Sequence, residues 1–315
     1  MSTLDQDLDA LAQPVTTHGL ELTDARQARV GDLTVRRLLP LRLRRSVGAW
    51  CFVDHYGPMS VDGVTGMAVP PHPHIGLQTV TWLLAGNVLH RDSLGSEQMI
   101  RPGQLNLMTA GRGIAHAEES PVEHDPELHG VQLWVALPEA SRLTEPAFEH
   151  HAQLPVHEAD GLEITVFMGG LASGRSSGRS PAMTFSRLVG AELSARRDVS
   201  TRLTLNPDFE HVIFVASGAA EVAGTGLRPG QLLYLPTGHD GIPLAAPNGS
   251  TMLLLGGVPL GERLLMWWNF VARKPEEIQG AVTDWDAGRF GEVGGYAGDP
   301  LKAPPLRADL LTRNP

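Results

Sequence analysis

The chain has 315 residues, of which 42% are apolar and 19% are charged, and its formal net charge is −10. This composition excludes an intrinsically disordered chain, and the length favours two domains, since single cores rarely extend beyond about 250 to 300 residues. The negative charge, without a dense basic cluster to offset it, argues against direct binding to nucleic acid.

Residues 1–27 come first and lack the basic start and apolar run of a signal peptide. We expect an N-terminal arm here, either loose or as a short helix over the first domain. No run of eighteen apolar residues follows, so no membrane span is predicted. Cys51 is the single cysteine, which excludes an intramolecular disulfide and favours a cytoplasmic location. Between Trp50 and Phe52, we expect Cys51 to be a buried small apolar residue.

Short apolar runs separated by turn residues then dominate residues 28–145, which we predict to form the first β domain. Its expected strands include 48–53, 78–84, 103–108 and 131–137. Three prolines interrupt this rhythm within residues 138–155, where we place the connection between domains. Strand-like runs resume within residues 146–315, the predicted second β domain, at 162–167, 211–215, 231–235 and 251–255.

A short internal repeat links the two halves. Residues 100–105 read Ile-Arg-Pro-Gly-Gln-Leu, and residues 227–232 read Leu-Arg-Pro-Gly-Gln-Leu. Each follows a strand closed by a glycine, so we predict that the halves arose by duplication. Near the C-terminus, residues 264–270 and 276–285 have helix-like spacing of apolar residues, which predicts one or two short helices.

Two pairs of potential metal ligands stand in the first half. His72 and His74 are separated by one residue, and prolines around them favour an extended backbone, so both imidazoles project from one face. His116 and Glu118 repeat this spacing, and a neighbouring strand could complete a set of four ligands. Three nitrogens and one oxygen without a thiolate suit Fe, Mn, Ni, Cu or Zn. An octahedral ion would keep two open positions for substrate, whereas structural zinc usually recruits cysteine.

Other histidines carry a weaker signal. Because they lie near turns or charged stretches, we predict solvated surface positions for six of them, namely His90, His124, His129, His150, His151 and His239. His55 follows Asp54, which could orient it as a supporting partner of the metal ligands.

Several stretches of the first half resemble the pirin family of the cupin superfamily, and in particular its bacterial branch. They are Val53–Pro58, His72–Gly76, Met108–Glu118 and Val131–Val135. The second half carries a looser resemblance at 257–262, 268–271 and 276–278. Gln78 stands where many cupins have a ligating Glu, and Ile75 where animal pirins tend to have Arg.

The resemblance implies an all-β fold of two stacked, jelly-roll-like cupin barrels with a few short C-terminal helices. It also implies one iron, as Fe(II), bound in the first barrel by His72, His74, His116 and Glu118. The second barrel would have lost its metal, since it offers Asp208, Glu210 and His211 without a His-x-His pair. Gln78, Gln132 and Trp134 are candidates for the surroundings of the metal.

Three functions follow as hypotheses from this resemblance. The first is a quercetin 2,3-dioxygenase that opens a flavonol with dioxygen, with Glu118 as general base for the substrate hydroxyl. The second is a redox-sensing regulator whose metal controls docking onto a transcription factor or metabolic enzyme. The third is a metal that merely stabilises the barrel. The open ligand set favours the enzyme over the regulator.

Overall fold

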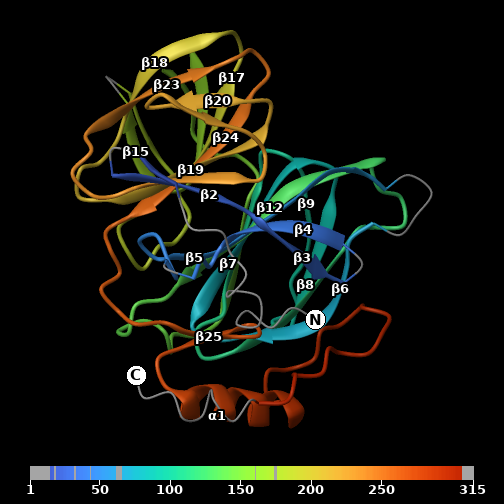
Figure 1. The fold of residues 1–315 in the computed structure, drawn as a ribbon. Helices are drawn as coiled ribbons and strands as arrows, with labels where there is room; N and C mark the ends of the chain where they lie inside the picture. The colour runs from blue at the N-terminus through green and yellow to red at the C-terminus, as the bar shows by residue number, and fades with distance from the viewer. Residues whose placement is uncertain are drawn as a thin grey trace.

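The computed structural model describes residues 15–17, 19–31, 33–42, 44–61, 66–159, 161–173 and 176–306. Within them, strands form two domains, each built from a large and a small antiparallel sheet. Figure 1 shows the second domain, in yellow and orange, above the first, in blue and green. The predicted all-β architecture of two cupin-like halves is therefore confirmed.

The first domain contains two sheets. The seven-stranded sheet runs, in spatial order, β13 (Ala147–His151), β10 (Leu105–Thr109), β7 (Leu77–Ala85), β12 (Glu127–Ala136), β5 (Trp50–Ser60), β4 (Leu33–Leu39) and β3 (Arg26–Val30). The four-stranded sheet runs β6 (Ala68–His74), β11 (Ile114–Glu119), β8 (Val88–Asp92) and β9 (Glu97–Ile100). This smaller sheet carries all four predicted metal ligands.

The second domain repeats the plan. Its large sheet runs β1 (Val15–Thr17), β2 (Leu20–Asp24), β22 (Gln231–Leu235), β19 (Glu210–Ser217), β24 (Thr251–Gly257), β17 (Leu188–Ala195), β15 (Leu162–Ser173) and β14 (Val156–Ala159), with β16 (Ser176–Arg179) paired to β15. Its small sheet runs β18 (Val199–Thr204), β23 (Gly241–Ala246), β20 (Ala220–Val222) and β21 (Thr225–Leu227).

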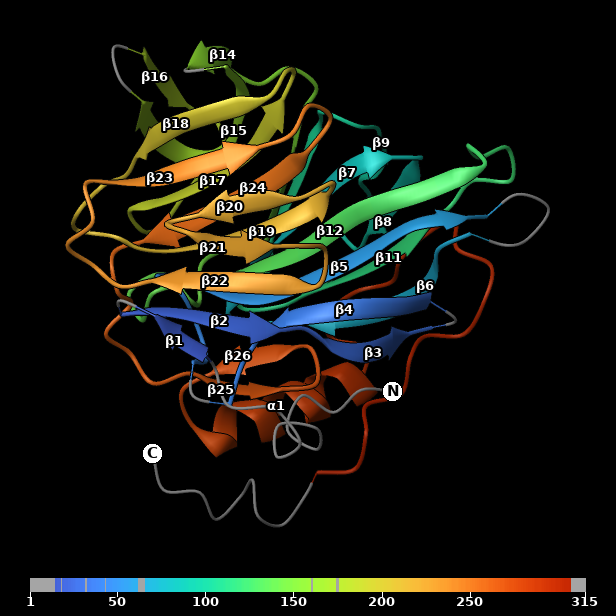
Figure 2. The same ribbon diagram turned by 45° about the horizontal axis from the view of Figure 1, so that its top comes forward.

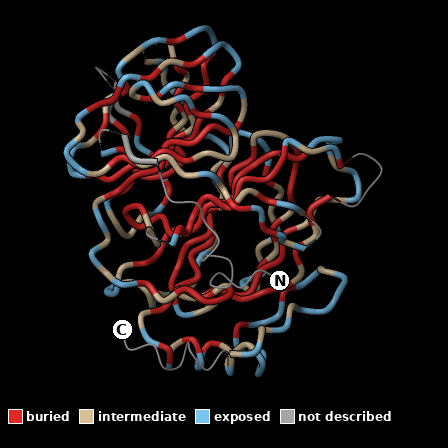
Figure 3. Tube along the Cα trace, in the orientation of Figure 1, coloured by how far each residue is buried: buried red, intermediate tan, exposed pale blue. Residues whose placement is uncertain are grey.

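The large sheets of the two domains pack face to face. Successive side chains of a strand point to opposite faces, and β19 shows the consequence. Val212 and Phe214 enter a core shared with Trp50 and Trp82 of the first domain, whereas Ile213 fills the interior of the second domain. Figure 3 shows buried strands gathered where the domains meet. The domains therefore share a continuous apolar core.

The repeated hexapeptide forms the same turn in both halves. Gly103 and Gly230 have φ values of 78° and 89°, which a type II turn with proline before glycine requires. In each turn the backbone N–H of the glutamine donates to the backbone carbonyl three residues earlier. The N to O distance is 3.1 Å for both Gln104 and Gln231. Each turn joins equivalent strands, β9 to β10 and β21 to β22. This agreement supports the predicted duplication.

The N-terminal arm differs from its prediction. Residues 15–17 and 20–24 form β1 and β2, and β2 pairs with β22 of the second domain, as Figure 2 shows. The apolar Leu20 and Leu22 pack onto that domain's core, so this stretch is neither loose nor helical. Residues 1–14 lie outside the described part of the chain.

The C-terminal segment also differs in part. The predicted helix at 264–270 is wrong, because these residues form the hairpin of β25 (Leu265–Trp267) and β26 (Phe270–Ala272). A helix is present at α1 (Pro275–Asp286), with proline at its first position. No helix among the described residues is long and apolar enough to span a membrane.

This C-terminal segment returns to the first domain. Figure 1 shows α1 on the side of the first domain that lies away from the second. Ile75 bridges to Phe270, and the Val271 amide donates to the Ile75 carbonyl at 3.1 Å. Gly76 has no side chain, and a Cβ there would lie 2.0 Å from the Val271 carbonyl oxygen. A glycine at this turn is therefore what permits the close contact.

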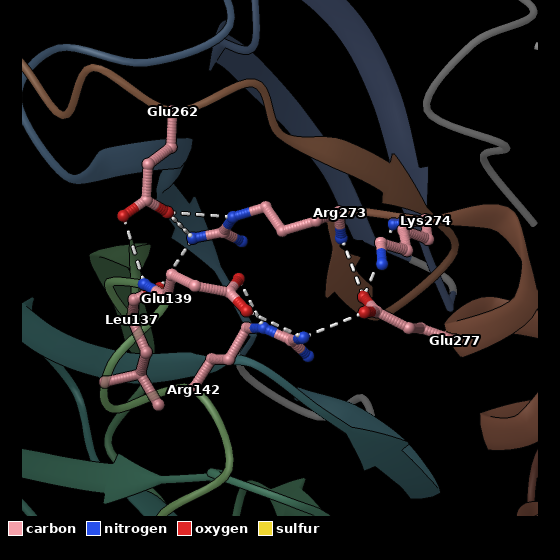
Figure 4. Close-up of polar contacts among 7 residues, drawn as sticks. All are labelled: Leu137, Glu139, Arg142, Glu262, Arg273, Lys274 and Glu277. Atoms are coloured by element: carbon pink, nitrogen blue, oxygen red, sulfur yellow. Dashed lines mark hydrogen bonds and ion pairs between the residues drawn. The ribbon is translucent and has the colours of Figure 1, made fainter. Parts of the chain in front are cut away.

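A network of hydrogen bonds and ion pairs holds the C-terminal segment against the first domain (Figure 4). The Arg273 guanidinium donates to Glu262 at 2.9 Å and to the Leu137 carbonyl at 2.7 Å. Arg142 donates to Glu277 of α1 at 2.8 Å. Leu137 and Arg142 lie between β12 and β13 of the first domain, so these bonds join α1 and the hairpin to that domain.

Candidate metal centre

Three histidines converge on adjacent strands of the small sheet. His72 and His74 lie on β6, and His116 lies on β11 directly opposite His72 in the antiparallel register. The ring centroids are 4.4 Å apart for His72 and His116, 4.9 Å for His74 and His116, and 5.0 Å for His72 and His74. All three are buried. The extended backbone predicted from the proline-rich sequence is what points His72 and His74 the same way.

The outer nitrogens of two rings have partners that fix the tautomer. Nδ1 of His74 lies 2.9 Å from the carbonyl oxygen of Asn269, and Nδ1 of His72 lies 2.8 Å from that of Pro70. Because a carbonyl oxygen only accepts, each Nδ1 carries the proton and each Nε2 keeps a lone pair. Asn269 is contributed by the C-terminal segment, so that segment orients a residue of the first domain.

A chain of contacts orients His116 in the same sense. Nε2 of His90 lies 3.1 Å from a carboxylate oxygen of Asp92, and Nδ1 of His90 lies 3.4 Å from Nδ1 of His116. The carboxylate accepts the Nε2 proton of His90, so Nδ1 of His90 accepts from Nδ1 of His116. Nε2 of His116 is then left with a lone pair, as in His72 and His74. A carboxylate behind a ligating histidine is a recurrent feature of metal sites.

This arrangement fits a bound cation. Nε2 of His74 and Nε2 of His116 lie 3.1 Å apart, although the tautomers place a lone pair on each. Burial lowers the pKa of all three rings, that of His72 to about 4, so they are neutral at pH 7. Neutral imidazoles with converging lone pairs are the form in which histidine binds metals.

Glu118 lies beside this cluster rather than inside it. His72, His74 and His116 form one group of possible ligand atoms within 4.8 Å of one another, and His90, His116 and Glu118 form a second. The register of β11 against β6 shifts between His116 and Glu118. Thr81 Oγ1 donates to Glu118 Oε1 at 2.8 Å, which leaves Oε2 for a metal or a proton. Burial raises the pKa of Glu118 despite that hydrogen bond.

A cavity of about 240 Å³ opens onto the cluster. His72, His74, His116 and Glu118 all line it, and so do Gln132 and Trp134. Phe52 stacks on Trp134 with ring centroids 4.1 Å apart. Pockets for drug-sized ligands span roughly 300 to 1,000 Å³, so this cavity suits one small planar molecule.

Charged groups occupy the same cavity. Arg37 and Asp54 form a buried ion pair with an Nη2 to Oδ2 distance of 2.7 Å, and both line the wall. Arg37 also lies over the Phe52 ring at 4.6 Å. The C-terminal segment adds Trp268, Asn269 and Leu301 to the lining. The cavity is therefore completed by residues far apart in the sequence.

Two predicted supporting residues lie elsewhere. Nε2 of His55 is 2.9 Å from Nε2 of His129, on the adjacent strands β5 and β12 of the large sheet, and burial lowers the His55 pKa to about 3. The Gln78 amide donates to Thr109 at 2.9 Å and to the Met183 carbonyl at 3.2 Å. Neither side chain lines the cavity described above.

The surface prediction for His90 and His129 is wrong, since both are buried. The missed signal for His90 is the alternation in β8, where Val88, His90 and Asp92 are buried on one face while Leu89 and Arg91 are less so. A histidine two residues before an aspartate on such a strand places both groups together. Cys51 is fully buried as predicted, and burial raises its pKa to about 12.

Comparisons with known proteins identify the relatives of this chain. The sequence model of the family Pirin matches residues 32–135, and that of the Pirin C-terminal cupin domain matches residues 190–291. A Pseudomonas aeruginosa protein named "Putative quercetin 2,3-dioxygenase" is 47% identical over 92% of this chain and 91% of its own. A pirin-like protein of Caulobacter vibrioides is 38% identical over 85% of this chain and 93% of its own.

A solved structure agrees with these relatives. The crystal structure of quercetin 2,3-dioxygenase from Acinetobacter baumannii is 43% identical and superposes with a TM-score of 0.88. The match covers 92% of this chain and 96% of that one.

Proposed function

This chain belongs to the pirin family of two-domain cupin proteins, and from that premise we propose that it is a metal-dependent dioxygenase acting on a quercetin-like flavonol or another small enolic aromatic molecule. The observation that carries the proposal is the set of three neutral imidazoles whose lone pairs converge at the wall of an aromatic cavity. The dioxygenase names of two relatives support the reaction class.

We propose His72, His74, His116 and Glu118 as the ligands of one divalent metal. Nitrogen and carboxylate donors suit Fe(II), which we take as the metal in the cell, and Mn, Ni, Cu and Zn share this preference. When bound, the metal supplies a Lewis acid with open positions for substrate. His90 and Asp92 act behind His116 by fixing its proton on Nδ1.

The protein contributes orientation and proton transfer. Phe52 and Trp134 supply apolar surface to the cavity, beside which a flat substrate ring can lie. Glu118 is buried and has a raised pKa, so its Oε2 is suited to accept the proton of an enolic hydroxyl. Arg37 lines the same cavity, where its ion pair with Asp54 balances its charge and holds it beside the Phe52 ring.

The test is dioxygen uptake with quercetin by protein purified anaerobically and analysed for metal on the same sample. We expect near-stoichiometric metal and quercetin-dependent uptake. Glu118→Gln should retain the fold and lose most of the uptake, because the amide cannot accept the proton. Metal without uptake for quercetin and related enols would refute the dioxygenase and favour the alternative, a redox-sensing regulator that docks onto a protein partner.

A further inference from the structure

The second domain contains a cavity of its own, which the proposed function does not use. It has a volume of about 540 Å³ and is lined by apolar residues together with Arg179, Asn206 and His211. Its wall includes residues 205–207, the turn between β18 and β19. This turn is the counterpart of the one between β6 and β7, beside which His74 lies.

His211 is the unusual member of this wall. It lies on β19, where alternation directs it to the same side as Ile213, into the interior of the second domain. Its side chain is fully buried, and neither ring nitrogen has a hydrogen-bond partner. Leaving a buried polar group without a partner costs about 1 to 3 kcal/mol. Burial lowers its pKa to about 4, so the ring is a neutral donor and acceptor.

A metal is not the missing partner. Among the described residues, both groups of side chains able to hold an ion lie in the first domain. The strand that leads into β19 is β18, which carries the buried Leu203 where β6 carries two imidazoles. A single imidazole with apolar neighbours is a weak metal site but a good hydrogen-bonding group for an organic molecule.

The rim and walls of the cavity indicate the class of that molecule. Arg179 lines the cavity and is exposed, and no other described residue pairs with its guanidinium. A free guanidinium binds carboxylates through two parallel hydrogen bonds. Leu171, Leu205 and Phe209 add buried apolar surface to the lining of the same cavity. A ligand that satisfies all three features has a carboxylate, an apolar body and a polar substituent.

We propose that this cavity binds a small aromatic monocarboxylate. Its carboxylate pairs with Arg179, its ring packs against Leu205 and Phe209, and a hydroxyl on the ring bonds to His211. The site shares no residue with the metal centre, so this proposal can be tested separately from the dioxygenase proposal.

The experiment is calorimetric titration of the full-length, metal-containing protein with benzoate, 4-hydroxybenzoate and the uncharged benzamide. We expect one site per chain, with 4-hydroxybenzoate bound more tightly than benzoate and benzamide bound at least tenfold more weakly. Arg179→Gln should weaken both acids about tenfold, whereas Arg202→Gln, which removes an exposed arginine paired with Asp240 in the same domain, should change nothing.

His211→Leu separates the polar contact from the charge. It should bind benzoate as before and abolish the preference for 4-hydroxybenzoate, and thermal unfolding shows whether the variant is folded. An affinity that Arg179→Gln leaves unchanged would overturn the proposal, because it would place the acid elsewhere, including at the metal. Absence of binding at millimolar concentrations would overturn it as well.

Discussion

The two domains share one fold but fill their interiors differently. The interior of the second domain is a single large apolar cluster, with His211 at one end. In the first domain, apart from the core that both domains share, one apolar cluster lies around Trp134 and another around Tyr56, and the metal cavity is lined from both. Duplication therefore preserved the strands and turns. A few residues on β6 and β11 make the difference between the metal centre of the first domain and the apolar interior of the second.

Supporting contacts differ in the same way. Every histidine of the triad has its outer nitrogen near a defined acceptor, contributed by Pro70, Asn269 or His90. His211 has no such partner on either nitrogen. We conclude that the first domain is built to present imidazole lone pairs and that the second is not.

The largest effect is expected from replacing a histidine of the metal site, where the two domains differ most. His74→Ala should lose metal and lower quercetin-dependent dioxygen uptake by more than about 100-fold, because a ligand contributes more than its supporting partner, whose loss costs about 10- to 100-fold. His211→Leu, the matched change of a buried histidine in the second domain, should keep its metal. Elemental analysis of both variants is the measurement, and metal loss in His211→Leu alone would reverse the assignment.

A smaller effect is expected from replacing Asp92, whose carboxylate accepts a hydrogen bond from His90. Asp92→Asn presents an amide N–H to Nε2 of His90 and so favours the other tautomer, whose Nδ1 proton faces His116. His116 would then carry its own proton on Nε2, toward the metal. We expect metal affinity to fall about 10- to 100-fold in a competition titration with a chelator. Unchanged affinity would show that the Asp92, His90 and His116 contacts do not set the tautomer.

The dependence of stability on pH should report the burial of His211 in the second domain. The pKa of His211 is about 4 in the folded state, below the unfolded value of 6.5. The contribution of the neutral ring to the free energy of unfolding is therefore present above pH 6.5 and is lost as pH falls toward 4. Between pH 7.5 and 5 the loss from this residue is about 2 kcal/mol. Chemical unfolding of His211→Leu should therefore show a smaller loss over this interval than the parent protein, and an equal loss would contradict the assignment.

The smallest effect concerns the returning C-terminal segment. Glu262→Gln removes the ionic partner of Arg273 in a partly exposed network, which should lower the free energy of unfolding by about 1 kcal/mol or less. Hydrogen exchange should rise mainly in residues 264–286. The control is Arg112→Gln, which removes an exposed ion pair with Glu145. Faster exchange spread evenly over both domains would argue against a local role for this network.

The sequence predicted local features better than distant contacts. The spacing of His72 and His74 is a local feature, so the geometry of an extended strand was enough to predict that both side chains project from one face. The hairpin at 264–272 was missed because its apolar spacing suits either a helix or a short buried strand, and tertiary packing decides between them. Asn269 and Leu301 could not be assigned to the cavity, since only the folded chain brings them beside β6.

The central claim is that one metal is bound in the first domain and none in the second. Anomalous diffraction from crystals of anaerobically purified protein, recorded on both sides of the iron absorption edge, tests it most directly. We expect one peak per chain, among His72, His74, His116 and Glu118, and no peak at His211. A peak in the second domain, or no peak from any transition metal at its own edge, would contradict it.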